Sequence, residues 1–202
     1  FLSYFCLFPD FSSALTLLVL SSPIPQVKQS LPQTGGEQMM DSCVFYAEKL
    51  LRNITDTLTQ TKLFSGIDCR KQNMELNLET STPSVCSPRT STCSGSTKSE
   101  FDEESCLMNI GADLTHYHNL LSAQPDPDNL LNLSVLSSLR ELMENCFKES
   151  LPTKLAPRKD AVDTTRNFNE RLSLCKVLRG FQVRTITINR AISYMNSGEH
   201  LQ

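Results

Sequence analysis

The last third of the chain carries apolar side chains on two opposite faces of one predicted helix, which spans residues 162–196. Alternating spacings of four and three residues place one set of side chains on a single face. This stripe consists of Leu174, Leu178, Phe181, Thr185, Ile188, Ile192 and Met195. Such a stripe buries a helix against the rest of its own domain. Residues 183–188 are rich in β-branched side chains and would also suit a strand, but the longer period on both sides favours a helix.

The opposite face of the same helix is the candidate docking surface. It comprises Arg179, Val183, Ile186, Thr187, Arg190 and Tyr194. A helix that faces only water needs no valine, isoleucine or tyrosine there, whereas an apolar strip with an arginine and a tyrosine is typical of a protein interface. The alternative is a central helix buried on all sides, and the sequence does not separate the two interpretations.

Three earlier segments, residues 41–62, 100–122 and 128–149, also have helical periodicity. Their predicted core positions are Val44, Ala47, Leu51, Ile54 and Leu58 in the first, Leu107, Ile110, Leu114, Tyr117 and Leu121 in the second, and Leu136, Leu139, Met143 and Cys146 in the third. Asp41 or Ser42 can cap the first helix, and Ser99 with Asp102 can form a capping box for the second. The connections are long, short and intermediate in length, which indicates an all-α, up-up-down-down, long-chain four-helix bundle.

The cysteines and the N-terminus indicate a secreted, extracellular protein. Eight cysteines without a CxxC pair favour disulfides formed in an oxidising compartment. The apolar residues 11–20, followed by Ser21-Ser22-Pro23, suit a signal peptide over residues 1–22. We expect a flexible segment at 23–40, a helical domain at 41–202 and no membrane insertion. Asn53 and Asn132 begin sequons for N-glycosylation.

The composition gives little support for catalysis, for a metal or cofactor, or for nucleic-acid binding. The net charge is −3, and the seven glycines form no phosphate-binding loop. His116 and His118 are two residues apart on a helix and therefore point to different sides. The acidic residues 102–104 are most simply explained as a helix start. The predicted class is therefore a secreted interaction module and not an enzyme.

The last helix carries a set of motifs that resembles the final helix of the interleukin-12 alpha subunit family. Leu174-Cys175 precedes an apolar pair, and then follow the motifs Phe181-Gln182-Val183-Arg184, Thr187-Ile188-Asn189-Arg190 and Ser193-Tyr194. Ser173 stands where the family has a lysine. Weaker matches are residues 79–82 before Cys86, residues 105–107 with Asp113, Leu114 and Tyr117, and residues 141–143. The resemblance extends over about residues 41–196.

The resemblance implies a helical cytokine subunit that pairs with a soluble, receptor-like beta subunit and acts on receptors of the gp130 class. It also implies disulfides Cys43–Cys93, Cys69–Cys175 and Cys86–Cys106. Mammalian members carry a further cysteine in the first loop, bonded to the beta subunit, and no cysteine remains here for that role. Cys146 is then an extra cysteine, which we interpret as a buried free thiol in preference to an intermolecular one. Docking without a covalent link is therefore expected.

The resemblance implies that two residues contact other proteins. Arg190 matches the family arginine that enters an acidic pocket of the beta subunit; the alternative is a solvated arginine near a helix C-terminus. Phe64 lies near the position of the family's receptor-contacting aromatic. Two other functions fit the pattern: a helical cytokine that acts as a single chain, and a secreted carrier of apolar ligands with an internal cavity.

Overall fold

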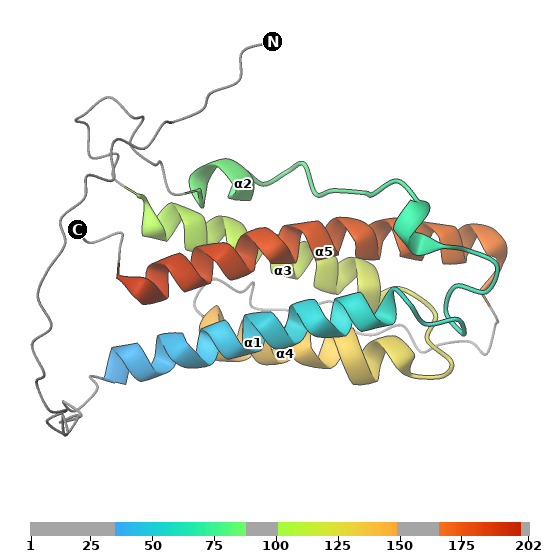
Figure 1. The fold of residues 1–202 in the computed structure, drawn as a ribbon, viewed down its shortest axis with the longest axis horizontal. Helices are drawn as coiled ribbons and strands as arrows, with labels where there is room; N and C mark the ends of the chain where they lie inside the picture. Colours follow the sequence, from blue (N-terminus) through green and yellow to red (C-terminus); the bar gives the residue numbers. More distant parts are fainter. Residues whose placement is uncertain (1–34, 88–100, 149–165, 199–202) are drawn as a thin grey trace, which may run out of the picture. The chain divides into compact units, whose positions relative to one another are not determined.

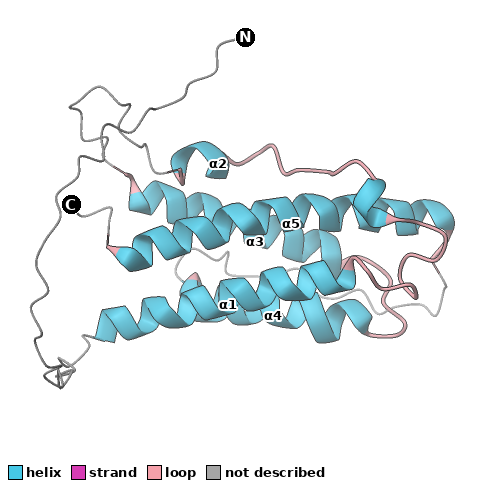
Figure 2. Cartoon of the chain, in the orientation of Figure 1, coloured by secondary structure: helices cyan, strands magenta, loops and turns pink. Residues whose placement is uncertain are grey.

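The computed structural model describes residues 35–87, 101–148 and 166–198, and every regular element within them is helical (Figure 1). The elements are α1 (Gly35–Thr57), η1 (Cys69–Lys71), α2 (Thr82–Val85), α3 (Glu103–Ser122), η2 (Asn132–Leu136), α4 (Ser137–Cys146) and α5 (Phe168–Ser197). No strand occurs in the described part of the chain (Figure 2). The prediction of an all-α fold is confirmed. None of the helices described is long and apolar enough to cross a membrane.

Several helix ends differ from the prediction. α1 begins at Gly35, so Asp41 and Ser42 lie inside the helix and do not cap it, and the helical domain starts before residue 41. The first helix ends at Thr57 because residues 58–66 form turns. Asp102 is itself the N-cap of α3, since its carboxylate accepts from the backbone N–H of Ser105 at 3.0 Å. The expected partner in the capping box, Ser99, lies outside the described residues.

The start of α5 is fixed by a reciprocal capping box. Asn167 accepts from the backbone N–H of Glu170 at 3.0 Å, and the Glu170 carboxylate accepts from the backbone N–H of Asn167 at 2.8 Å. Gly198 ends the helix in a left-handed conformation, with φ of 68°. The helix is therefore shorter at its N-terminus than the predicted span of 162–196.

The long helices pack as a bundle in which α1 and α3 each contact both α4 and α5. All seven residues of the predicted α5 stripe are buried in the common core. In α1 the buried face is turned slightly from the prediction: Leu50 is buried, whereas Leu51 and Val44 are half-buried. Leu50 and Leu51 are both apolar. Leu50 is the buried one because α1 packs against α4 and α5 at the same time.

Three disulfides lie within the described residues: Cys43–Cys146, Cys69–Cys175 and Cys86–Cys106. The second and third are the pairs implied by the resemblance. The implied pair Cys43–Cys93 is wrong, and so is the free thiol at Cys146, because α1 and α4 pack side by side and bring these two Cα atoms to 5.7 Å. Cys93 lies outside the described residues.

Residues 72–80, which we call the strap, form an extended segment that leads from η1 to α2 (Figure 1). The backbone N–H of Glu75 donates to the carbonyl of Lys176 in α5 at 3.0 Å. A Cβ atom on Gly180 would lie 1.7 Å from the carbonyl oxygen of Glu75. Glycine at this position therefore allows the strap backbone to lie directly on α5.

Candidate functional site: the outward face of α5

The outward face of α5, defined by the six residues of the candidate docking surface, combines exposed apolar side chains with a cation. Val183 and Ile186 are 37% and 36% exposed, although both are large and apolar. Thr187 is half-buried beside them. The alternative prediction, a helix buried on all sides, is therefore wrong, because Val183 and Ile186 on the second face stay exposed in the described part of the chain while the first face is buried.

Arg190 is exposed at the centre of the C-terminal half of this face. Its guanidinium forms no hydrogen bond or salt bridge with any residue in the described ranges, whereas Arg52 on α1 pairs with Glu48 at 3.4 Å. An unpaired guanidinium beside apolar side chains has all of its donors available for an acidic group on another molecule.

Two other residues of the face are already engaged within the chain. Arg179 donates from Nη1 to the carbonyl oxygens of Cys69 and Arg70, which ties η1 to α5. The ring of Tyr194 packs edge-on against Phe101, with centroids 5.2 Å apart. The structure therefore places Arg179 and Tyr194 at the margins of the face, where their positions are set by internal contacts.

A buried polar cluster, which the sequence analysis missed, lies beneath the strap. Nε of Arg184 lies 3.2 Å from a carboxylate oxygen of Asp113, and the two side chains are 4% and 0% exposed. Asp113 also accepts from Asn77 at 2.9 Å, Thr80 at 2.7 Å and Thr82 at 2.5 Å. We call these five residues the Asp113 cluster. It joins α5, α3, the strap and the first residue of α2 through one carboxylate.

The strap is held to the same place by two further contacts. Nη2 of Arg184 donates to the carbonyl of Asn77 at 2.6 Å, and the backbone N–H of Asn77 donates to the hydroxyl of Tyr117 at 3.1 Å. The Tyr117 ring stacks on Phe181 with centroids 4.4 Å apart. Burial raises the pKa of Tyr117 above its usual value, despite the opposing bond from Asn77, so the phenol stays neutral.

Phe64, the expected receptor-contacting aromatic, is 4% exposed and belongs to the core. This expectation is wrong, because a ring covered by its own domain presents no surface to a receptor. The turn after α1 packs inward at this point, which the sequence pattern did not indicate.

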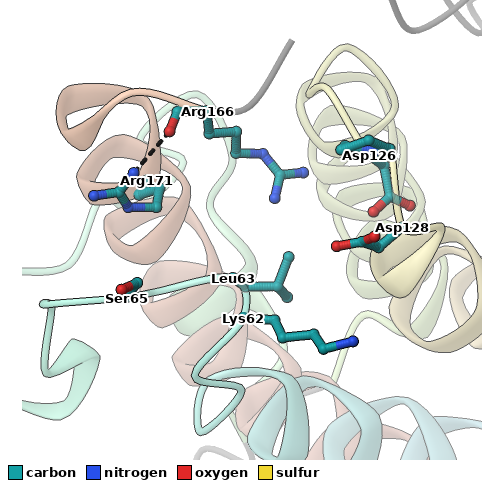
Figure 3. A pocket seen from close by; sticks show the side chains of 8 residues that line it. Lys62, Leu63, Ser65, Asp126, Asp128, Arg166 and Arg171 are labelled. Carbon is teal, nitrogen blue, oxygen red and sulfur yellow. Dashed lines mark hydrogen bonds between the residues drawn. The ribbon is translucent and has the colours of Figure 1, made fainter. Parts of the chain in front are cut away.

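A pocket near Phe64 is bordered by the loop after α1, the α3–α4 connection and the start of α5 (Figure 3). Its lining includes Lys62, Asp126, Asp128, Arg166 and Arg171. Burial lowers the pKa of Arg166, and the neighbouring carboxylates of Asp126, Glu170 and Asp128 oppose this shift. A lining with so many charged groups does not suit an apolar ligand.

The two sequon asparagines lie on different elements: Asn53 is on α1, where it contacts η2, and Asn132 is the first residue of η2. Nδ2 of Asn53, the atom that glycosylation modifies, donates to the carbonyl of Ser134 at 3.3 Å. Asn132 instead uses its carbonyl oxygen to accept from Arg140 at 3.0 Å. Both side chains are half-buried, and glycosylation at either position stays a prediction.

Comparison with known proteins identifies the family of the chain. The family model described as "Interleukin-12 alpha subunit" matches residues 69–198, well over half of the chain. The interleukin-12 subunit alpha of Cervus elaphus is 27% identical, over 91% of this chain and 96% of that protein. The protein of the same name from Canis lupus familiaris is 25% identical, over 91% of this chain and 96% of that protein. The one from Sus scrofa is also 25% identical, over 84% of this chain and 88% of that protein. The chain belongs to the interleukin-12 alpha subunit family of cytokine subunits.

Proposed function

We propose that this chain is the secreted alpha subunit of a heterodimeric interleukin-12-type cytokine, and that it docks on a receptor-like beta subunit through the outward face of α5. One observation carries the proposal: α5 buries a complete apolar stripe and still exposes Val183 and Ile186 beside an arginine with no partner in the described chain. Exposed apolar surface with an embedded arginine is characteristic of an interface centre.

Arg190 is assigned the specific contact. A planar guanidinium can bind a carboxylate through two parallel hydrogen bonds, and the bonds gain strength when the partner excludes water. Val183, Ile186 and Thr187 supply the apolar surroundings that would exclude it. The proposal also includes regulation of immune cells through paired receptors of the gp130 class. This part is supported by membership of the family alone.

The up-up-down-down connection of the bundle is part of the same proposal. The colours of Figure 1 advance along α1 and α3 in one direction and along α4 and α5 in the other. The two long connections, residues 58–102 and 147–167, join helices that run in the same direction, as a crossover must.

The disulfides bear on whether the heterodimer is covalent. Since Cys43 pairs with Cys146, Cys93 is the cysteine beyond the expected signal peptide that no described disulfide includes. We propose that docking is non-covalent at the α5 face. Cys93 is the residue to examine by non-reducing mass spectrometry for an additional link to the partner.

Co-expression with a beta subunit, followed by capture of the complex, tests the proposal. Arg190→Asp is expected to abolish capture while the far-ultraviolet circular dichroism stays unchanged, because the side chain is exposed and forms no hydrogen bond or salt bridge with the described residues. Lys148→Asp, which reverses an exposed charge after α4, is the matched control and leaves capture intact. Undiminished capture of Arg190→Asp would refute the interface, and full activity of the chain secreted alone would refute the heterodimer.

A further inference from the structure

The strap has the hydrogen-bonding pattern of an edge strand. In extended backbone, the N–H and C=O of one residue point to the same side, and successive residues alternate. The N–H of Glu75 bonds to α5 and its carbonyl lies against Gly180, while the N–H and carbonyl of Asn77 bond to Tyr117 and Arg184. The odd-numbered residues thus direct their backbone groups inward, towards α3 and α5.

The even-numbered residues direct theirs the other way. The backbone N–H and C=O groups of Met74, Leu76 and Leu78 form no hydrogen bond to any residue that the structure describes. Their side chains are also exposed, by 43%, 38% and 87% respectively. An open backbone edge with three aligned apolar side chains is a template for pairing with another strand.

This edge adjoins the outward face of α5. Gly180 and Arg184, which contact the strap, precede Val183 and Thr187 respectively by three residues, and side chains three apart are neighbours on a helix surface. The strap therefore runs along the border of the outward face of α5, on the side of Val183 and Thr187.

We propose that the strap pairs, through Met74, Leu76 and Leu78, with an edge strand of the beta subunit, which adds a backbone-mediated contact to the docking surface of α5. The inference rests on the proposed function. An extended strand is the occupant because only another extended backbone can satisfy alternating, outward-facing N–H and C=O groups. Receptor-type domains are commonly β-sandwiches and possess such edges. The exposed carboxylates of Glu75 and Glu79 favour a partner strand with basic side chains.

Residue-resolved amide hydrogen exchange tests the pairing in the intact chain. In the free chain, the amides of Glu75 and Asn77 exchange slowly and those of Met74, Leu76 and Leu78 exchange fast. On capture by the beta subunit, at least two of these three fast amides are expected to slow by about tenfold or more. If a complex forms and none of the three slows, the pairing is wrong and the proposed function stands. If no beta subunit is bound at all, both are overturned.

Amide exchange in the free chain provides a second test of the pairing. Slow exchange of all three even-numbered amides before any partner is added would overturn the proposal. If that protection falls on dilution, a second copy of the chain occupies the edge; if it does not, a segment of the chain itself covers the strap.

A matched pair of variants separates backbone pairing from side-chain contact. Leu76→Pro removes the outward N–H and leaves the inward bonds of Glu75 and Asn77 in place, whereas Leu76→Ala removes a similar amount of apolar surface and keeps the N–H. We expect Leu76→Pro to weaken capture about tenfold relative to Leu76→Ala. Equal capture by two variants with wild-type melting temperatures would overturn the pairing. Should Leu76→Pro melt early, the exchange experiment on the wild type decides alone.

Discussion

Removal of the Asp113 carboxylate is expected to be among the most destabilising single changes in the chain. Asp113→Ala leaves the Arg184 guanidinium buried without its counter-ion, and leaves Asn77, Thr80 and Thr82 without their common acceptor. Breaking a buried ion pair from one side costs about 3–5 kcal/mol. Since domains have about 5–15 kcal/mol of total stability, this loss is a large fraction of the whole.

Guanidinium unfolding at pH 7 with intact disulfides measures the loss. Asp56→Ala, which removes an exposed carboxylate from α1, is the control and is expected to change stability by less than about 0.5 kcal/mol. The double variant Asp113→Leu/Arg184→Met should be more stable than Asp113→Ala, because no charge is then left buried. A loss below about 1 kcal/mol for Asp113→Ala, or strictly additive effects of the two positions, would refute the ion-pair argument.

Three more predictions concern the strap, acid stability and the disulfides. Gly180→Val should displace the strap from α5, at a cost of about 1–3 kcal/mol in stability. The Glu75 amide should then exchange faster than in the wild type, and equally slow exchange in the variant would contradict the close approach of the strap to α5. Burial, aided by the positive charge of Arg140, lowers the pKa of His118 in the folded chain. The unfolded chain therefore binds the proton more tightly, so the stability of the fold decreases as the pH drops below about 6.5. His118→Gln should make the stability less dependent on pH in this range, and an equal dependence in wild type and variant would contradict the argument. Replacing Cys43 and Cys146 together by serine should cost about 5 kcal/mol in the chain-entropy model, because the two residues are 103 positions apart. Recovery of a Cys43–Cys93 peptide from the wild type would disprove the pairing.

The sequence predicts the part of the fold that local periodicity encodes. The predicted α5 stripe is correct at all seven positions because every position has an apolar or threonine neighbour three or four residues away in the same stripe, and the five inner positions have one on each side. In α1 the adjacent Leu50 and Leu51 are equally apolar, so the pattern alone could not decide which one is buried. The decision comes from contact with α4 and α5 together.

The Asp113 cluster could not be predicted in the same way. A charged residue within a helical pattern is normally assigned to the solvent face. Arg184 nevertheless lies three residues after Phe181 and four before Ile188, which places it on the buried side of α5. That spacing is the one signal available in the sequence, and it indicates burial without identifying Asp113 as the partner.

The cysteine pairing depends on how the helices are arranged and not on their sequences. Cys43 lies on the buried face of α1, and Cys146 lies at the C-terminal end of α4, on the face predicted for the core. A bond between them requires only that these helices pack side by side, which periodicity does not reveal. The resemblance supplied a different partner for Cys43, because it did not account for the additional cysteine in α4.

The Asp113 cluster also connects stability to docking. It holds Asn77 against α5 and so fixes the direction in which the neighbouring residues of the strap present their backbone groups. If the strap moved, the edge formed by Met74, Leu76 and Leu78 would lose its alignment with Val183, while Arg190, further along α5, would keep its position. A mild change such as Thr80→Val removes one donor to Asp113 and keeps the ion pair. It should therefore weaken capture of the beta subunit through the strap alone, and a capture strength unchanged from the wild type would show that the strap and the α5 face act independently.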